Sequence, residues 1–233
     1  MIKNIIEGRT DLIFELLKSG VVANHVDENG VSLIRWAAYY GDVSAIKLLL
    51  SKGEVLSSLG ENFDLGGAVF HGHWQLCQFL IESGADVNFV QKDSGESLLH
   101  SALCKANRPV YDIIVKMLLA SGANPNIKTI PHIYTDSFMR DVKTKGETPL
   151  HRAAAFGSEV VIDLLLAAGA NKELLDANQE SPLRWASWHL RPANILRKLC
   201  YGKFKIHSGN NSKYDHGANW GTQDESLLGK PIL

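Results

Sequence analysis

Short apolar segments alternate with polar, glycine-containing segments along the first 202 residues. Six apolar segments are each closed by a glycine, a residue that ends helices by adopting the left-handed backbone conformation. These glycines, at positions 20, 53, 84, 122, 169 and 202, are 33, 31, 38, 47 and 33 residues apart, which is typical of a repeat protein. We predict helices at Leu12–Leu17, Ala45–Leu50, Leu76–Ile81, Ile113–Leu119, Val160–Leu166 and Ile195–Cys200.

A second recurring segment precedes the last five of these helices. Its clearest copy is Thr148-Pro149-Leu150-His151-Arg152-Ala153-Ala154. A Ser or Thr at its first position caps the amides of a helix, proline suits the first helical position, and small alanines allow close helix packing. We therefore predict a first helix in each unit, and the other four copies are Ser32–Ala38, Phe63–Val69, Ser97–Leu103 and Ser181–Ser187.

The segment from Gly146 to Ala154, followed by Leu164–Asn171, resembles an ankyrin repeat nearly letter for letter. The resemblance covers residues 1–202 and implies an all-α ankyrin-repeat solenoid of about six helix-turn-helix units with β-hairpin-like loops. It divides the chain into a cap (1–26), repeats at about 27–57, 58–91, 92–126, 143–175 and 176–202, and a long hairpin insertion (127–142). The C-terminal tail, 203–233, has no repeat register. We expect it to be partly ordered, docking through Phe204 and Ile206.

Two units are longer than the repeat allows. The third gains four residues around 106–111, and the loop between Asn126 and Gly146 is about 13 residues longer than its counterpart. Insertions in repeat proteins often lie on the binding face, yet lengthening a loop also costs little. Both interpretations stay open for the insertion, whose apolar residues include Tyr134 and Phe138.

Composition narrows the function classes. The chain is 45% apolar and 21% charged with a formal net charge of −1, so it lacks the basic stripe that nucleic-acid binding requires. It contains no apolar run of membrane-spanning length and no signal peptide, so we expect a cytoplasmic protein with no membrane partner, while secretion by a route that needs no signal peptide stays open. We also expect a monomer. The three cysteines lie in different repeats without metal-site spacing, and we expect reduced thiols.

The nine histidines raise the question of catalysis or metal binding. His71 and His73 could form a metal pair, but Gly72-His73 is the usual turn between the two helices of an ankyrin unit. The resemblance implies that His100 and His151 make structural hydrogen bonds. Because phosphate loops, nucleophile elbows and metalloprotease motifs are absent from the sequence, we predict no enzyme activity, cofactor or metal.

In the ankyrin fold, the two residues before the turn between the helices point into the concave face. We call these the palm positions, and they are Tyr39, Tyr40, Phe70, His71, Cys104, Lys105, Ala155, Phe156, Trp188 and His189. Exposed aromatic residues anchor protein interfaces, so we predict a partner-binding surface there, with Tyr134 and Phe138 of the insertion contributing. The alternative is that these rings pack on the chain's own loops. Trp36 and Trp185 are expected to be buried between repeats.

The expected function is a non-catalytic module that binds a protein partner through this aromatic face and the exposed hairpin tips. The tips include Glu96, Thr144, Glu147 and Glu180. Two alternatives are an immunity or antitoxin-like inhibitor of a toxic enzyme, and a bacterial effector delivered into a eukaryotic host. Rescue of growth on co-expression with a toxic gene product would distinguish the first, and a translocation assay the second.

Overall fold

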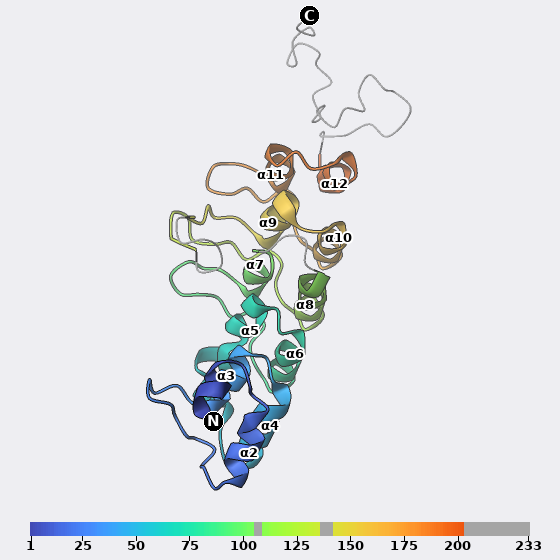
Figure 1. Ribbon diagram of the computed structural model, residues 1–233. Coiled ribbons are helices and arrows are strands. Elements are labelled where there is room, and N and C mark those ends of the chain that lie inside the picture. The colour runs from blue at the N-terminus through green and yellow to red at the C-terminus, as the bar shows by residue number, and fades with distance from the viewer. Residues whose placement is uncertain (105–108, 136–141, 203–233) are drawn as a thin grey trace, which may run out of the picture. The chain divides into compact units, whose positions relative to one another are not determined.

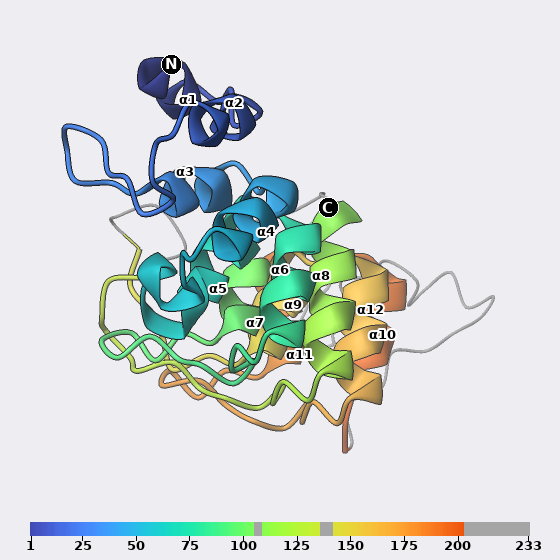
Figure 2. The same ribbon diagram turned by 90° about the horizontal axis from the view of Figure 1, so that it is seen from below.

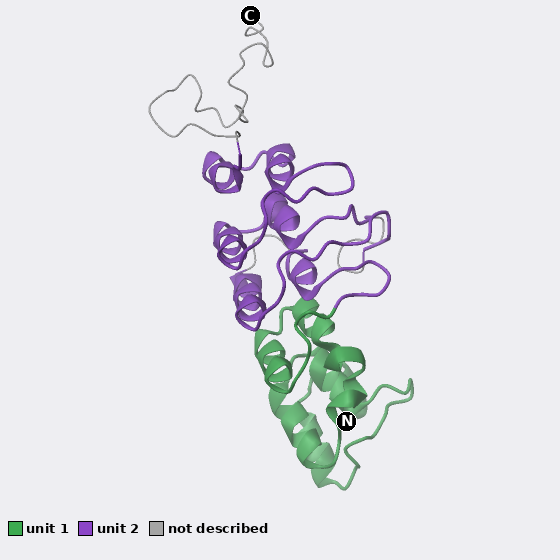
Figure 3. Ribbon diagram, turned by 180° about the vertical axis from the view of Figure 1, so that it is seen from behind, with its two compact units in different colours: residues 1–89 green, residues 90–233 purple. Residues whose placement is uncertain are grey.

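The computed structural model describes residues 1–104, 109–135 and 142–202 (Figure 1). Its described residues form twelve α-helices and two short 3-10 helices, with isolated β-bridges in the loops in place of a sheet. The chain divides into two compact units, residues 1–89 and 90–233 (Figure 3). The predicted all-α ankyrin solenoid is confirmed. The predicted tail contacts lie outside the described residues.

Unit 1 is a stack of short helical pairs. A short pair, α1 (Ile2–Ile6) and α2 (Leu12–Lys18), is followed by α3 (Leu33–Tyr39) with α4 (Val43–Ser51) and by α5 (Leu65–His71) with α6 (Trp74–Glu82). Helix α3 packs on α5, while α4 packs on both α2 and α6. The N-terminal segment is therefore itself a helical pair and covers the first full repeat.

Unit 2 contains three pairs: α7 (Leu98–Ala102) with α8 (Pro109–Ala120), α9 (Pro149–Phe156) with α10 (Glu159–Ala167), and α11 (Pro182–Trp188) with α12 (Ala193–Leu199). The first helices α7, α9 and α11 form one row and the second helices α8, α10 and α12 form the other (Figures 1 and 2). The alanines between the rows, including Ala153 and Ala154, are fully buried. All predicted second helices are present, each within a few residues of its expected bounds.

The capping roles predicted for the repeat motif are met at three first helices. Ser97 and Thr148 each form a capping box with the histidine three residues on, and the Ser181 hydroxyl accepts the Arg184 N–H at 3.3 Å. His100 and His151 also reach the following loop, with Nε2 at 3.1 Å from the Glu147 carbonyl and 3.0 Å from the Glu180 carbonyl, respectively. The structural role predicted for both histidines is confirmed. Ser32 caps α3 through its backbone conformation alone.

The entry to α5 differs from the hairpin-like loop expected before each first helix. Residues 54–64 form two 3-10 turns, η1 (Leu56–Leu59) and η2 (Glu61–Asp64), rather than a hairpin. Asp64 caps α5, and its carboxylate accepts the Gly67 N–H at 3.2 Å. Asn62, Phe63 and Asp64 all have left-handed backbone angles (φ 50°, 54° and 55°), which shift the start of the helix by one residue.

Candidate functional site

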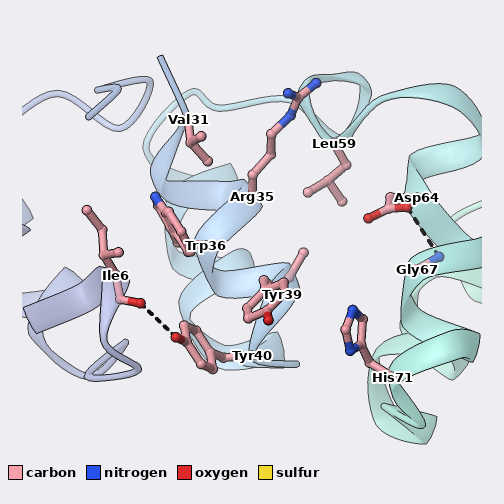
Figure 4. Close-up of a pocket in the computed structure, with 11 residues that line it drawn as sticks. Ile6, Val31, Arg35, Trp36, Tyr39, Tyr40, Leu59, Asp64, Gly67 and His71 are labelled. Atoms are coloured by element: carbon pink, nitrogen blue, oxygen red, sulfur yellow. Dashed lines mark hydrogen bonds between the residues drawn. The ribbon is translucent and has the colours of Figure 1, made fainter. Parts of the chain in front are cut away.

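The first candidate site is a pocket of about 740 Å³ in unit 1, beside α3 and α5 (Figure 4). Aromatic rings of α3 and its C-cap form one side, and the Tyr39 ring lies 5.0 Å from the His71 ring of α5 across the pocket. We call this the unit 1 pocket; its other lining residues include Ile6, Val31, Arg35, Trp36, Tyr40, Leu59, Asp64 and Gly67.

The pocket depends on a missing side chain. Gly67 stands at the repeat position that carries Trp36, Arg152 and Trp185 in other units. A Cβ built at Gly67 would lie 2.6 Å from the nearest Asp64 carboxylate oxygen. Glycine therefore both leaves the pocket open and allows the Asp64 carboxylate to cap α5.

The two tyrosines of the unit 1 pocket are held differently. The Tyr40 hydroxyl donates to the Ile6 carbonyl oxygen at 2.7 Å (Figure 4), and the Tyr40 ring lies against Gly8. Tyr40 therefore fastens the N-terminal pair to α3. Tyr39 is 52% exposed and contacts neighbouring rings by its edge, so its side chain is more available to a partner.

The second candidate site is a groove of about 460 Å³ in unit 2. One wall is the base of the insertion, which we call the insertion stem (residues 129–135 and 142–147), and the other consists of α9 and the end of α11. We call this the unit 2 groove; it is lined by Thr135, Val142, Lys143, Thr144, Lys145, Glu147, Arg152, Phe156, Glu180, Trp185, Trp188 and His189.

Trp36 and Trp185 line these sites, so the prediction that they are core residues was wrong. Both are only half-buried. The Trp36 indole N–H donates to Asp27 Oδ2 at 2.9 Å, and the Trp185 indole N–H donates to Asp176 Oδ2 at 3.0 Å. An indole at this slot turns towards the loop before its helix because an aspartate nine residues earlier accepts its hydrogen bond.

Trp188 is the most exposed aromatic residue of the unit 2 groove, at 67%. Its indole N–H nevertheless donates to Glu180 Oε1 at 3.2 Å, and the Arg184 guanidinium lies 5.9 Å from its ring centre. Arg184 also pairs with Glu180 at 3.3 Å. Trp188 is thus presented to solvent in a defined orientation.

A buried ion cluster lies beneath the unit 2 groove. Arg152 Nη2 contacts Glu96 Oε1 at 2.7 Å and Glu147 Oε1 at 2.6 Å, with all three side chains at most 4% exposed. Arg152 Nη1 also donates to the His100 carbonyl oxygen at 3.0 Å. One guanidinium therefore joins α9 to the loops that precede α7 and α9.

The cluster shifts the pKa of its members. Burial opposes the charged form of Glu147, but Arg152, the Lys145 N–H and the Thr129 hydroxyl outweigh it and lower the pKa of Glu147 to about 2. Burial, reinforced by the Arg152 charge, lowers the pKa of His100 to about 3. At neutral pH, the cluster thus holds ionised Glu147 beside a neutral histidine.

The insertion stem is tied into this cluster through two threonines. The Thr135 hydroxyl donates to Glu96 Oε1 and the Thr129 hydroxyl to Glu147 Oε2, each at 2.7 Å. Glu96, Thr144 and Glu147 are 1%, 2% and 3% exposed, so the prediction that they are exposed tip residues was wrong. Glu96 and Glu147, which each directly precede a cap residue, turn inward because Arg152 stands at the repeat position that tryptophan occupies in two other units.

The structure distributes the predicted partner residues over both sites. Tyr39, Tyr40 and His71 line the unit 1 pocket, while Phe156, Trp188 and His189 line the unit 2 groove. Phe70 is half-buried with its ring 5.3 Å from that of His71, and Tyr134 is exposed on the insertion stem. Lys105 and Phe138 lie outside the described residues. Lys145, which the sequence placed at a hairpin tip, lines the unit 2 groove, whereas the sequence prediction of partner residues did not include Arg35, Asp64 or Lys143.

Within the described residues, no group of three or more His, Cys, Asp or Glu side chains is arranged to hold a metal ion. His71 and His73 stack with their ring centres 5.8 Å apart, and His73 Nε2 bonds the Tyr39 carbonyl at 2.9 Å. The three cysteines, all within the described residues, form no disulfide, and burial raises the pKa of Cys77 to about 12. The helices of the described part are too short or too polar to cross a membrane.

Stacked pairs of short helices with capping histidines are the architecture of a helical repeat protein. Comparison with known protein families identifies the same architecture. The family model for ankyrin repeats in three copies matches residues 2–88 and 114–210, and that for a single ankyrin repeat matches residues 94–130. The chain belongs to the ankyrin-repeat family.

The similar proteins include a palmitoyltransferase, a nuclear factor subunit and a SOCS box protein. Palmitoyltransferase ZDHHC13 of Mus musculus is 28% identical over 192 residues, 74% of this chain and 31% of that protein. Nuclear factor NF-kappa-B p105 subunit of Gallus gallus is 31% identical over 72% of this chain and 16% of its own length. Ankyrin repeat and SOCS box protein 3 of Bos taurus is 30% identical over 76% of this chain and 31% of its own length. The chain thus spans a third or less of these relatives, and the ankyrin-repeat fold that they share is typically non-enzymatic.

Proposed function

We propose that this chain is a non-catalytic module that binds a protein partner through the unit 1 pocket and the unit 2 groove. Ankyrin repeats generally mediate protein–protein interaction, and the observation that supports these sites is the placement of Tyr39 and Trp188. Each lies at the C-terminal end of a first helix, and their side chains are 52% and 67% exposed.

Exposed aromatic side chains are frequent energetic anchors of interfaces because they bury a large area with few rotatable bonds. Trp188 is also held by Glu180 and Arg184 before any partner arrives. Binding then requires little further ordering of the side chain, which reduces the entropic cost of association. Tyr40 contributes less directly, since its hydroxyl is occupied by the N-terminal pair.

Affinity capture from the native cell lysate tests this function with three baits. The wild-type chain is compared with Tyr39→Glu/Trp188→Glu and with the control Phe14→Glu/Val160→Glu. Phe14 and Val160 are exposed at 37% and 56% on second helices, so the control makes the same chemical change away from both sites. Equal melting temperatures of the three baits confirm that the fold is retained.

A near-stoichiometric protein that is retained by the wild type and the control but lost from the Tyr39/Trp188 variant supports the proposal. A partner that stays on that variant places the binding surface elsewhere on the chain. The identity of the retained protein also tests the inhibitor interpretation, which requires a toxic enzyme.

A further inference from the structure

The rim of the unit 2 groove carries positive charge that is not neutralised within the described chain. Lys143 and Lys145 are both exposed, and neither ammonium group has a carboxylate partner among the described residues. Instead, Lys143 Nζ lies 4.8 Å from the ring centre of Tyr134, and Lys145 Nζ lies 5.4 Å from that of Trp185. Such contacts orient the ammonium groups and leave their charge intact.

The carboxylates near these lysines already have cationic partners. Glu180 pairs with Arg184 at 3.3 Å and accepts the Trp188 indole N–H. Glu147 is buried against Arg152 at 2.6 Å. Among the described residues of the rim, the positive charge without a carboxylate partner is therefore that of the two lysines.

The unit 2 groove is lined by aromatic rings, and hydrogen bonds hold two of them. Trp185 is fixed by its hydrogen bond to Asp176, Trp188 by its bond to Glu180, and Phe156 lies beside them on α9. A groove that joins fixed apolar rings to unpaired cations suits a ligand with an apolar anchor and nearby negative charge.

We propose that the unit 2 groove binds a segment of a partner protein in which a large apolar or aromatic side chain has an Asp or Glu within about three residues, a reach of roughly 10 Å in extended chain. The apolar side chain packs against Trp185, Trp188 and Phe156, and the carboxylate pairs with Lys143 or Lys145. This inference rests on the proposed function and specifies the partner chemistry of one of its two sites.

A protein segment suits the groove better than a nucleic-acid strand. Strand binding requires cations that follow several consecutive phosphates, whereas two lysines here lie beside a single aromatic cluster. A single-stranded oligothymidine therefore serves as the competing probe in the test.

The test selects ligands from a random peptide library displayed on phage, with the full chain immobilised. Enriched sequences are made as fluorescein-labelled peptides, and their dissociation constants are measured by fluorescence anisotropy. The groove variants are Trp188→Ala and Lys143→Glu/Lys145→Glu. Their controls are Leu190→Ala, which removes an 86% exposed side chain outside the groove lining, and Lys116→Glu/Lys52→Glu, which changes net charge equally.

We expect enriched peptides that combine an apolar anchor with Asp or Glu, and an increase of about tenfold or more in the dissociation constant for each groove variant. Replacing the peptide carboxylate by its amide and raising the salt concentration should each weaken binding. The controls should bind like the wild type.

The inference is overturned by an absence of enrichment, by enriched peptides without carboxylates, or by oligothymidine binding more tightly than any peptide. Peptides that lose binding to Tyr39→Glu but not to the groove variants occupy the unit 1 pocket; the proposed function then stands while this inference fails. Peptides unaffected by any of these variants would contradict both.

Discussion

Replacing Arg152 by methionine should cause a large loss of stability in unit 2. The substitution keeps most of the apolar stem and removes the only guanidinium among the described residues that contacts Glu96 and Glu147. Two carboxylates with at most 4% exposed side chains are then left without their cation. Removing one partner of a buried ion pair costs about 3–5 kcal/mol, so we expect at least this range for Arg152→Met.

The loss should depend on pH. In the wild type, the pKa of Glu147 is about 2 against 4.5 ordinarily, so its stabilising contribution is complete above 4.5 and lost as pH falls towards 2. The pKa of His100 is lowered from 6.5 to about 3, so the unfolded chain takes up a proton first and wild-type stability also falls between these values.

In Arg152→Met the direction of the Glu147 pKa shift reverses, and with it the contribution of Glu147 to the pH dependence of stability. Burial without the guanidinium raises the pKa of this carboxyl above its ordinary value, so the folded variant binds a proton more readily than the unfolded chain. The difference in unfolding free energy between wild type and variant should therefore narrow as the pH is lowered from about 7.5 to about 5.

Urea unfolding followed by tryptophan fluorescence and far-UV circular dichroism measures both effects. Glu96→Gln/Glu147→Gln/Arg152→Met, which removes all three charges, should recover more than half of the lost stability. Lys198→Met removes a partly exposed cation that also bridges two carboxylates, at 3.1 Å from Glu159 and 2.6 Å from Asp163, and should cost far less. A loss below about 1 kcal/mol for Arg152→Met, or a difference that is constant with pH, would refute the reasoning.

Two further predictions concern other parts of the fold. Leu165→Ala removes a side chain that is 0% exposed in α10 and should lower the unfolding free energy by about 2–5 kcal/mol in the same urea assay; a loss below 1 kcal/mol would contradict its core role. Gly67→Ala should displace the Asp64 carboxylate from the cap of α5 and cost about 0.5–2 kcal/mol. Hydrogen exchange should then be faster at the N-terminus of α5, and unchanged exchange there would show that the cap is retained.

The positions of the helices could be predicted because two sequence signals mark each helical pair. A cap residue precedes the first helix, and a glycine follows the second. Thr148 and Gly169 are examples, and both perform the expected roles. Residues 54–64 were harder because three non-glycine residues with left-handed backbone angles replace the usual loop. No local pattern in Asn62-Phe63-Asp64 indicates that conformation.

The candidate sites were predictable only in part. Counting from the turn between helices identified Tyr39 and Trp188, because that position is set by the helix register alone. The burial of Glu147 depends on a residue five positions later, Arg152, and on a threonine from the insertion. A carboxylate beside a cap looks exposed in the sequence unless that cation is considered with it. The partial exposure of Trp185 could have been predicted from Asp176, nine residues earlier, which accepts the indole hydrogen bond.

The ties between the insertion stem and the ion cluster constrain how this loop can change over evolutionary time. Excising the loop would withdraw the Thr135 hydroxyl from Glu96, a charged group sealed inside the repeat. A shortened loop would thus need compensating changes at Glu96 or Arg152, so a viable intermediate requires more than one mutation. The insertion stem and the buried cluster of this repeat therefore form one structural unit, so this repeat could not be exchanged for one of its neighbours without changing both.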